Sequence, residues 1–205
     1  MFTTIGGQNV SRETYDRLQH FADLVRKWTP RINLISPTTI SDLWMRHVVD
    51  SVQIYPFAPP DFIRWVDIGS GGGFPGIVVA IIAKAENPNA TCVLIESDQR
   101  KGTFLRTAIR DLDLNATVIA SRIEEAAPQT ADIVSARALT SLSAMMPLLH
   151  RHLAPAGQAL LHKGKRHAEE IAEARRTWSF DLEERPSFTD PDARLLSLKG
   201  IHPVG

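Results

Sequence analysis

The stretch WVDIGSGGGFPGI, residues 65–77, has four glycines between positions 69 and 73 and a fifth at position 76. It overlaps an apolar run, IRWVDI (63–68), that has the composition of a buried strand. Glycine has no Cβ and adopts positive φ at little cost, so a ligand can approach the main chain closely at such a loop. A helix that begins directly afterwards offers free backbone N–H groups in its first turn. The stretch therefore predicts a ligand site between a strand and a helix.

Two classes of cofactor fit the glycine pattern. Gly71, Gly73 and Gly76 match the G-x-G-x-x-G fingerprint of dinucleotide sites, a weak signal within a run of glycines. In the other frame, Asp67 precedes a G-x-G-x-G that begins at Gly69, which resembles the first motif of S-adenosylmethionine-dependent methyltransferases. In that frame Asp67 is expected to face the positively charged methionine part of the cofactor, directly or through water.

Glu96 ends the next strand candidate, TCVLIE (91–96). An acidic side chain at this position accepts hydrogen bonds from ribose hydroxyls in nucleotide-binding folds. Glu96 therefore favours a nucleoside cofactor, and it leaves open whether that cofactor is NAD or S-adenosylmethionine.

Strands and helices alternate along the rest of the chain. Further strands are expected at 116–120, 132–136 and 158–163, with 179–184 and 194–199 pairing as closing strands. Helices are expected from Pro75 and Gly76 to Lys84, from 99 to 112 with Asp98 as N-cap, and at 141–153 and 165–177. This order predicts an α/β fold, a doubly wound and mainly parallel sheet of seven strands. In such sheets the ligand lies beyond the carboxyl ends of the strands, where the glycine stretch also falls.

Two helical patterns precede the first strand. Residues 11–28 carry an apolar stripe at spacings of three and four, with Ser11 as N-cap and Pro30 expected to end the helix. Residues 38–53 repeat the helical spacing. We therefore expect residues 1–60 to form a helical extension packed on a core of residues 61–205.

Composition limits the function classes. Of 205 residues, 43% are hydrophobic and 22% charged, and Lys+Arg and Asp+Glu balance at 23 each. A nucleic-acid partner must therefore be held by local basic patches and not by a global positive field. The single cysteine, Cys92, excludes an internal disulfide, and the sequence shows neither signal-peptide features nor an apolar run long enough to span a membrane. We expect a cytoplasmic protein with no membrane association, by default a monomer.

Several motifs together resemble one family, the bacterial small-subunit ribosomal RNA methyltransferase G family, also called glucose-inhibited division protein B. They are NLIS (33–36), RHVVDS (46–51), VDIGSGGGFPGI (66–77), LIES (94–97), RKGTFLR (100–106), SRIEE (121–125), SARALTSL (135–142) and HKGK (162–165). The resemblance covers residues 15 to 175 or so, and the last 30 residues match poorly. Glu96 departs from the aspartate that many relatives carry, but the longer side chain still reaches a ribose diol.

The resemblance implies a class I methyltransferase that transfers a methyl group from S-adenosylmethionine to N7 of a guanine in the 530 loop of 16S rRNA, leaving S-adenosylhomocysteine and using no metal. The substrate would be 16S rRNA or the small ribosomal subunit. Carried over to this sequence, Gly69 and Phe74 would contact the cofactor, Ile123 and Glu124 would frame its adenine end, and Arg137 would lie where cofactor and substrate meet.

Guanine N7 has a lone pair and no proton, so its methylation needs alignment of the reactants and no general base. Arg137 and Lys163 are the expected positioning residues. The expected RNA contacts are Arg46, His47, Arg100, Lys101, Lys163 and Lys165. The alternative for each of them is a solvated position on the surface with no role in RNA binding. Asp50 is expected to pair with Arg46 one turn away, and His162 and His167 are expected to be solvated.

Other functions stay open at this stage. The chain would also fit an S-adenosylmethionine enzyme that acts on another RNA or on a small molecule. A nicotinamide-dependent oxidoreductase is disfavoured by Asp67 ahead of the loop. A non-catalytic RNA-binding module would leave the glycine loop and Glu96 without a role.

Overall fold

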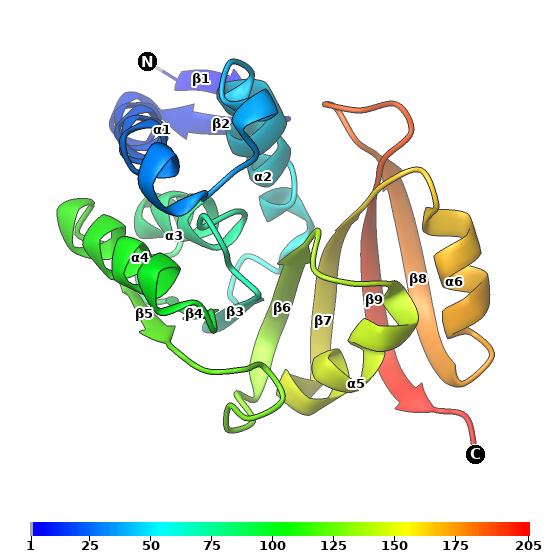
Figure 1. Cartoon of the computed structure of the whole chain (residues 1–205). Helices are drawn as coiled ribbons and strands as arrows, with labels where there is room; N and C mark the ends of the chain where they lie inside the picture. The colour runs from blue at the N-terminus through cyan, green and yellow to red at the C-terminus, as the bar shows by residue number, and fades with distance from the viewer. Residues whose placement is uncertain (1) are drawn as a thin grey trace.

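The structure is a computed structural model that describes residues 2–205, and its centre is one seven-stranded sheet (Figure 1). The strand order is β5-β4-β3-β6-β7-β9-β8. The strands are β3 (Arg64–Ile68), β4 (Thr91–Ile95), β5 (Ala116–Ile119), β6 (Ala131–Arg137), β7 (Leu153–Lys163), β8 (Trp178–Pro186) and β9 (Arg194–Pro203). Pairing is parallel from β5 through β7, whereas β9 is antiparallel to both of its neighbours. The predicted mainly parallel sheet of seven strands and the pairing of the closing strands are confirmed.

Helices cover both faces of the sheet, as its two buried hydrophobic clusters require. One face carries α3 (Gly76–Glu86) and α4 (Gln99–Asp111), and the other carries α5 (Leu142–His152) and α6 (His167–Ala174) (Figure 1). Asp98 caps α4 by accepting from the backbone N–H groups of Arg100 and Lys101, as predicted. Helix α3 is buried from Gly76 to Ala83 because it packs between the sheet and a further helix, α1.

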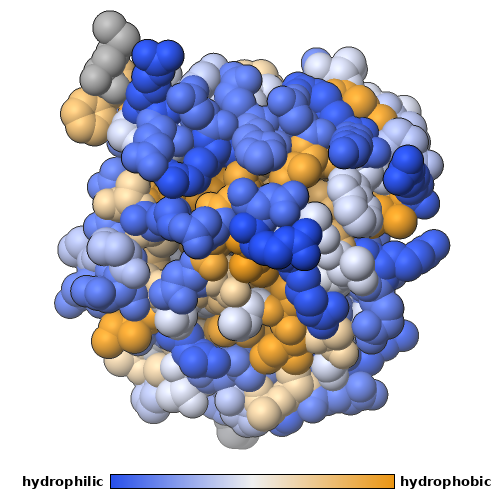
Figure 2. Space-filling view, turned by 90° about the vertical axis from the view of Figure 1, so that its left-hand side faces the viewer, coloured by the Kyte–Doolittle hydropathy of each residue, from blue (hydrophilic) through white to orange (hydrophobic). Residues whose placement is uncertain are grey.

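Helix α1 (Arg12–Ile32) forms the outer layer on that face. Ser11 is its N-cap and accepts from Thr14 N. The prediction that Pro30 ends the helix is wrong: the helix continues two residues further. Asn33 then ends it in the left-handed conformation, φ 51°, with its N–H donating to Thr29 O. Figure 2 looks onto the side that carries α1 and α4 and shows a largely hydrophilic surface around a few apolar side chains.

The rest of the first 60 residues does not form the continuous helix that was expected at 38–53. It contains a short hairpin, β1 (Phe2–Ile5) with β2 (Gln8–Ser11), and a 3₁₀ turn, η1 (Pro37–Thr39). A π-helical segment, η2 (Trp44–Val49), then leads into α2 (Asp50–Val52) and a second 3₁₀ turn, η3 (Tyr55–Phe57). π-Helical turns are rare and frequent at functional sites. Here η2 carries Arg46 and His47.

Side chains from both parts of the chain form one cluster: Val25 and Leu43 are buried together with Trp65 and Ile77. The domain boundary predicted at residue 60 therefore does not separate two cores, and it stays a prediction. No helix within residues 2–205 is both long and apolar enough to cross a membrane.

Candidate functional site

The glycine loop connects β3 to α3 at the carboxyl edge of the sheet. The backbone N–H groups of Gly69 and Ser70 both donate to Ile95 O, at 2.9 and 3.1 Å, so the loop is tied to the end of the neighbouring strand β4. Gly71 has φ +54°, and a Cβ there would meet only Gly69 O, at 3.8 Å. A side chain at Gly71 would therefore enter open space in front of the loop and occupy the position of a ligand.

That space is a cavity of about 800 Å³. Its volume lies within the roughly 300–1,000 Å³ that is typical of small-molecule and cofactor sites. Of the nine residues predicted to hold the cofactor, seven line it: Gly69, Gly71, Phe74, Glu96, Ile123, Glu124 and Arg137. Gly73 and Asp67 are not part of its lining, and a Cβ on Gly73 would meet Ile77 and Phe21. Lys101, predicted as an RNA contact, is also part of the cavity wall.

Glu96 braces the loop from the next strand. Its carboxylate is 8% exposed and accepts two backbone hydrogen bonds, from Gly71 N to Oε2 and from Asp98 N to Oε1, both at 2.8 Å. Each carboxylate oxygen can accept more than one hydrogen bond. The side chain can therefore hold the loop and still receive the two hydroxyls of a ribose in the cavity.

Asp67 departs from its predicted orientation. The side chain is 1% exposed, accepts from Ser135 Oγ at 2.7 Å and faces the start of α3, where a Cβ on Gly76 would lie 2.7 Å from Oδ2. Burial raises the pKa of Asp67 to about 6, although the Ser135 and Ser70 hydroxyls oppose the shift. The direct contact with a cofactor that the sequence suggested does not fit this position. Asp67 instead supports the loop from behind, next to the positive end of the helix dipole of α3.

Arg137 ends β6 and is held by the N-terminal segment. Its Nη2 donates to His47 Nδ1 at 2.8 Å, and its Nη1 donates to Arg46 O at 3.0 Å and to Asp50 Oδ2 at 3.2 Å. The guanidinium also lies over the Phe74 ring, 5.1 Å from its centroid. These contacts fix both position and orientation, because a planar guanidinium matches several acceptors at once.

His47 packs between Arg137 and Phe74, with its ring centroid 5.2 Å from that of Phe74. Since Nδ1 accepts from Arg137, Nε2 carries the proton and donates to Thr39 Oγ1 at 2.9 Å. Burial and the Arg137 guanidinium lower the pKa of His47 to about 4. The imidazole is therefore neutral at physiological pH, and it positions Arg137 where the sequence suggested a cationic RNA contact.

For two residues of this network, the structure shows other partners or another environment than the sequence predicted. Asp50 pairs with Arg137 and not with Arg46, and its Oδ1 accepts from Thr189 Oγ1 at 2.7 Å. Burial would raise the pKa of Asp50, but His162, Arg137 and the Thr189 hydroxyl together hold it below its usual value. The His162 side chain, expected to be solvated, is only 8% exposed, and its Nε2 donates to Asp50 O at 2.7 Å. The parallel pairing of Arg137 with His162 across β6 and β7 brings them together, a register that single-sequence patterns do not reveal.

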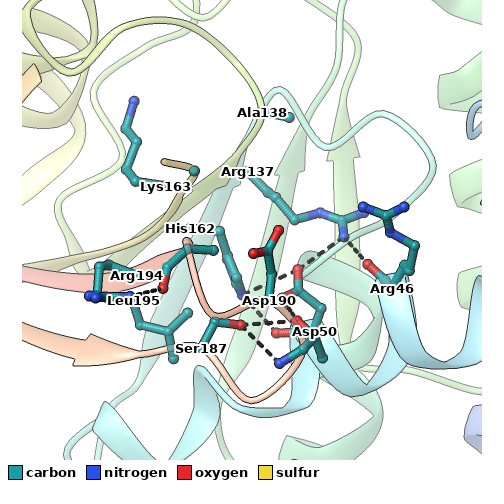
Figure 3. A pocket seen from close by; sticks show the side chains of 13 residues that line it. Arg46, Asp50, Arg137, Ala138, His162, Lys163, Ser187, Asp190, Arg194 and Leu195 are labelled. Atoms are coloured by element: carbon teal, nitrogen blue, oxygen red, sulfur yellow. Dashed lines mark hydrogen bonds and ion pairs between the residues drawn. The ribbon is translucent and has the colours of Figure 1, made fainter. Parts of the chain in front are cut away.

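A smaller cavity of about 210 Å³ lies beside the first, and both are lined by Arg137 and Ala138. Figure 3 shows its walls, which include Arg46, Asp50, His162 and the turn that follows β8. Lys163 also belongs to this lining, but its ammonium points away from the other labelled side chains. It is buried, donating to Thr140 O at 2.7 Å and to Glu170 Oε2 at 2.8 Å. The exposed RNA-binding position expected for Lys163 is therefore corrected, whereas a positioning role through Thr140 fits.

The remaining basic residues predicted to contact RNA lie outside the cavities or at their rim. Arg46 is exposed at the rim of the smaller cavity. Arg100 is exposed at the start of α4 and pairs with Asp98 at 3.0 Å. Lys165 is exposed in the turn after β7. The three side chains stand on elements that follow or flank the carboxyl edge of the sheet.

Comparison with known proteins identifies the family. The model described as rRNA small subunit methyltransferase G matches residues 14–195. The chain belongs to this family. A ribosomal RNA small subunit methyltransferase G from Cereibacter sphaeroides is 52% identical over 193 residues, covering 94% of each chain. A protein of the same name from Ruegeria pomeroyi is 48% identical over 193 residues, again with 94% of each chain covered.

Solved structures show the same fold at low identity. A TehB-like SAM-dependent methyltransferase from Corynebacterium glutamicum matches with a TM-score of 0.58 at 13% identity, over 88% of this chain and 98% of that one. A 16S rRNA N2 methyltransferase from Thermus thermophilus, in complex with AdoMet and guanosine, matches with a TM-score of 0.53 at 16% identity, over 74% and 38%. These likenesses confirm the Rossmann-like methyltransferase fold, and the family match confirms the resemblance seen in the sequence.

Proposed function

We propose that this protein transfers the methyl group of S-adenosylmethionine to N7 of a guanine in the 530 loop of 16S rRNA. The observation that carries the proposal is the pair of adjoining cavities that share Arg137, in a chain of the methyltransferase G family. One cavity has the size and glycine wall of a cofactor site. The other lies at the ends of β6 and β7, where a base can meet the cofactor.

The residues around the larger cavity fit S-adenosylmethionine. Glu96 is placed to receive the ribose hydroxyls, Gly69 and Gly71 leave room along the backbone, and Ile123 offers an apolar surface to the adenine. Glu124 stands beside Ile123 in the same wall. When bound, the cofactor supplies a methyl group on a sulfonium, with a neutral thioether as the leaving group.

The chain's own contribution to the reaction is alignment. N7 attacks with a lone pair and loses no proton, so the rate depends on holding nucleophile, methyl carbon and sulfur in line. Arg137 has three protein acceptors that fix it between the cavities, and neutral His47 is one of them. Lys163 holds Thr140, which follows Arg137 along the same loop, and thereby fixes the loop's far end. We assign Arg137 and Lys163 positioning roles on this basis.

RNA binding is proposed to use the exposed basic residues Arg46, Arg100 and Lys165, together with Lys101 at the cavity wall. They act as a local patch, since the chain's 23 basic and 23 acidic residues give no net field. A cytoplasmic location and a monomeric state complete the proposal, and both rest on the sequence arguments above.

The experiment is incubation of the protein with methyl-labelled S-adenosylmethionine and small ribosomal subunits that lack the modification. Naked 16S rRNA is tested in parallel. The expected result is label on one N7-methylguanine of the 530 loop. Label on another nucleotide, or none on either RNA despite measured cofactor binding, overturns the assignment and points to another RNA or a small molecule as substrate.

A further inference from the structure

The smaller cavity is built from four separated parts of the chain. Segment η2–α2 supplies Arg46 and Asp50, β6 ends in Arg137, β7 ends in His162 and Lys163, and the turn 187–193 between β8 and β9 closes the side (Figure 3). Its volume of about 210 Å³ lies below the roughly 300–1,000 Å³ of typical ligand sites. It has room for a fragment such as one flat base and not for a second nucleoside.

The turn that closes the cavity is fixed by hydrogen bonds to the N-terminal segment. Gln53 Nε2 donates to Ser187 Oγ at 3.0 Å, and Gln53 Oε1 accepts from Phe188 N at 2.8 Å. Thr189 Oγ1 donates to Asp50 Oδ1 at 2.7 Å. The next residue, Asp190, is thus presented to the cavity by an anchored backbone.

Two carboxylates line this cavity, and within residues 2–205 Asp50 has a cationic partner and Asp190 has none. Its Oδ1 accepts from Asp192 N at 2.9 Å, and Oδ2 makes no hydrogen bond within the described residues 2–205. Figure 3 shows the carboxylate pointing into the space between Arg137 and His162. Of the cations in the lining, Arg137 pairs with Asp50 and Lys163 with Glu170, whereas Arg46 and Arg194 make no ion pair within residues 2–205.

This arrangement favours a ligand rich in hydrogen-bond donors. A phosphate beside Asp190 would be repelled by its carboxylate, and Arg137 and Lys163 are already paired with other carboxylates. Arg46, exposed at the rim, has a position better suited to a phosphate of the surrounding RNA backbone.

We propose that the smaller cavity receives the target guanine and that Asp190 selects it by accepting from N1–H and from the exocyclic N2 amino group. This inference rests on the function proposed above. The Watson–Crick edge of guanine presents these two donors side by side, which matches the two oxygens of a carboxylate. Adenine would place its N1 lone pair against Asp190, a repulsive contact that rejects it.

The geometry of the purine also places the reacting atom. N7 lies on the opposite side of the ring system from N1 and N2. With its Watson–Crick edge at Asp190, the base turns N7 away from that carboxylate and toward Arg137 and Ala138, the residues that both cavities share. The base must leave its stack to enter, as bases do in other enzymes that modify them. Methylation makes the ring cationic, and the Asp190 charge then stabilises it.

The test is equilibrium binding of GMP, IMP and AMP to the protein saturated with S-adenosylhomocysteine, which blocks the larger cavity. IMP lacks only the N2 amino group. We expect GMP to bind about tenfold more tightly than IMP, the effect of one hydrogen bond to a charged acceptor, and AMP to bind more weakly still. Asp190→Asn keeps the shape and the acceptor for Asp192 N, and it should remove the preference. Asp192→Asn, on the same turn but outside the cavity, should keep it.

Equal binding of GMP and AMP to the unmodified protein overturns the inference, as does no GMP binding at millimolar concentration. A preference that survives in Asp190→Asn overturns the assignment to Asp190. S-adenosylhomocysteine affinity and the melting temperature of each variant confirm that it is folded. Because no methyl transfer is needed, these results stand apart from the labelling experiment: a protein that methylates no rRNA but prefers GMP would lose the proposed function and keep the guanine cavity.

Discussion

Glu96 Oε2 accepts a hydrogen bond from the backbone N–H of Gly71 across 2.8 Å, so the carboxylate expected to hold the ribose also holds the glycine loop. Glu96→Ala removes both functions. We expect S-adenosylmethionine affinity to fall about a hundredfold, as loss of two hydrogen bonds to a charged group implies. Calorimetric titration measures this. Glu125→Gln, an exposed position near the cavity but not in its wall, is the control and should bind normally. Unchanged affinity in Glu96→Ala would remove Glu96 from the site.

Gly71→Val tests whether the loop faces a ligand. A Cβ at this position would come no closer than 3.8 Å to its nearest neighbour, Gly69 O, and φ +54° should cost roughly 1–2 kcal/mol of stability. The variant should fold but lose cofactor binding, because valine fills the space in front of the loop. Gly102→Ala, in helix α4 with no atom closer than 3.6 Å, should gain about 0.5–1 kcal/mol and bind normally. Cofactor binding by a folded Gly71→Val would show that the ligand lies elsewhere.

Arg137→Lys keeps the charge and removes the fork that reaches Arg46 O, Asp50 and His47. We expect kcat for rRNA methylation to fall about a hundredfold, the effect of a small misalignment of the reactants. The affinity for S-adenosylmethionine should change little by comparison. Single-turnover rates with saturating cofactor separate the two quantities. A loss confined to cofactor affinity would assign Arg137 to the cofactor alone.

Asp67 should make stability depend on pH. Its pKa is raised from 3.8 to about 6, so between these values the folded state binds more protons than the unfolded state, and stability falls as pH rises. Relative to Asp67→Asn, the protein should lose about 2.4 kcal/mol of unfolding free energy between pH 4 and pH 7, somewhat less than the whole shift of about two pKa units because the unfolded Asp67 is already partly ionised at pH 4. Urea unfolding of both proteins across this range measures the difference. A constant difference would show that Asp67 is ionised throughout.

Lys163→Met should destabilise the protein and spare its RNA affinity. The substitution removes the cation that pairs with the Glu170 carboxylate in a largely buried place. We expect the free energy of unfolding to fall by about 3 kcal/mol. Lys163→Met/Glu170→Gln should recover part of this, because glutamine still accepts from Leu142 N. Urea unfolding measures stability, and filter binding of 16S rRNA measures affinity. Weaker RNA binding without a loss of stability would restore the surface role predicted from the sequence.

Much of the fold could be predicted because strands and caps carry local signals. The apolar runs at 63–68 and 91–96 differ from β3 and β4 by one residue at one end, and Asp98 caps α4 as expected. Pro30 was misleading because it lies in the last turn of α1. Only two residues of the helix follow it, and the helix tolerates the loss of the one hydrogen bond that the proline nitrogen cannot donate. The π-helical turn at 44–49 has the same apolar spacing as an α-helix, so sequence patterns did not separate the two.

The sequence predicted which residues lie near the candidate site, but not the directions in which several of their side chains point. Seven of the nine residues predicted to hold the cofactor line the larger cavity, since the glycine loop and strand ends fix where they lie. Asp67, Lys163 and His162 are different, because each side chain is held by a partner on another element. Ser135 binds Asp67 and Asp50 O binds His162, 68 and 112 residues away in sequence, and Lys163 donates to Thr140 O, 23 residues away. No sequence motif pointed to Asp190, which lies after residue 175, so only the structure brings it to the site.

Because the turn between β8 and β9 lies late in the chain, the two cavities are completed at different points of protein synthesis. The walls of the larger cavity come from residues between Leu34 and Leu148, whereas the smaller one is completed by residues up to Leu195. Every residue that lines the larger cavity is thus translated before Asp190, the carboxylate proposed to read the base. If the smaller cavity receives the base as proposed, its wall is the last part of the two cavities to be synthesised.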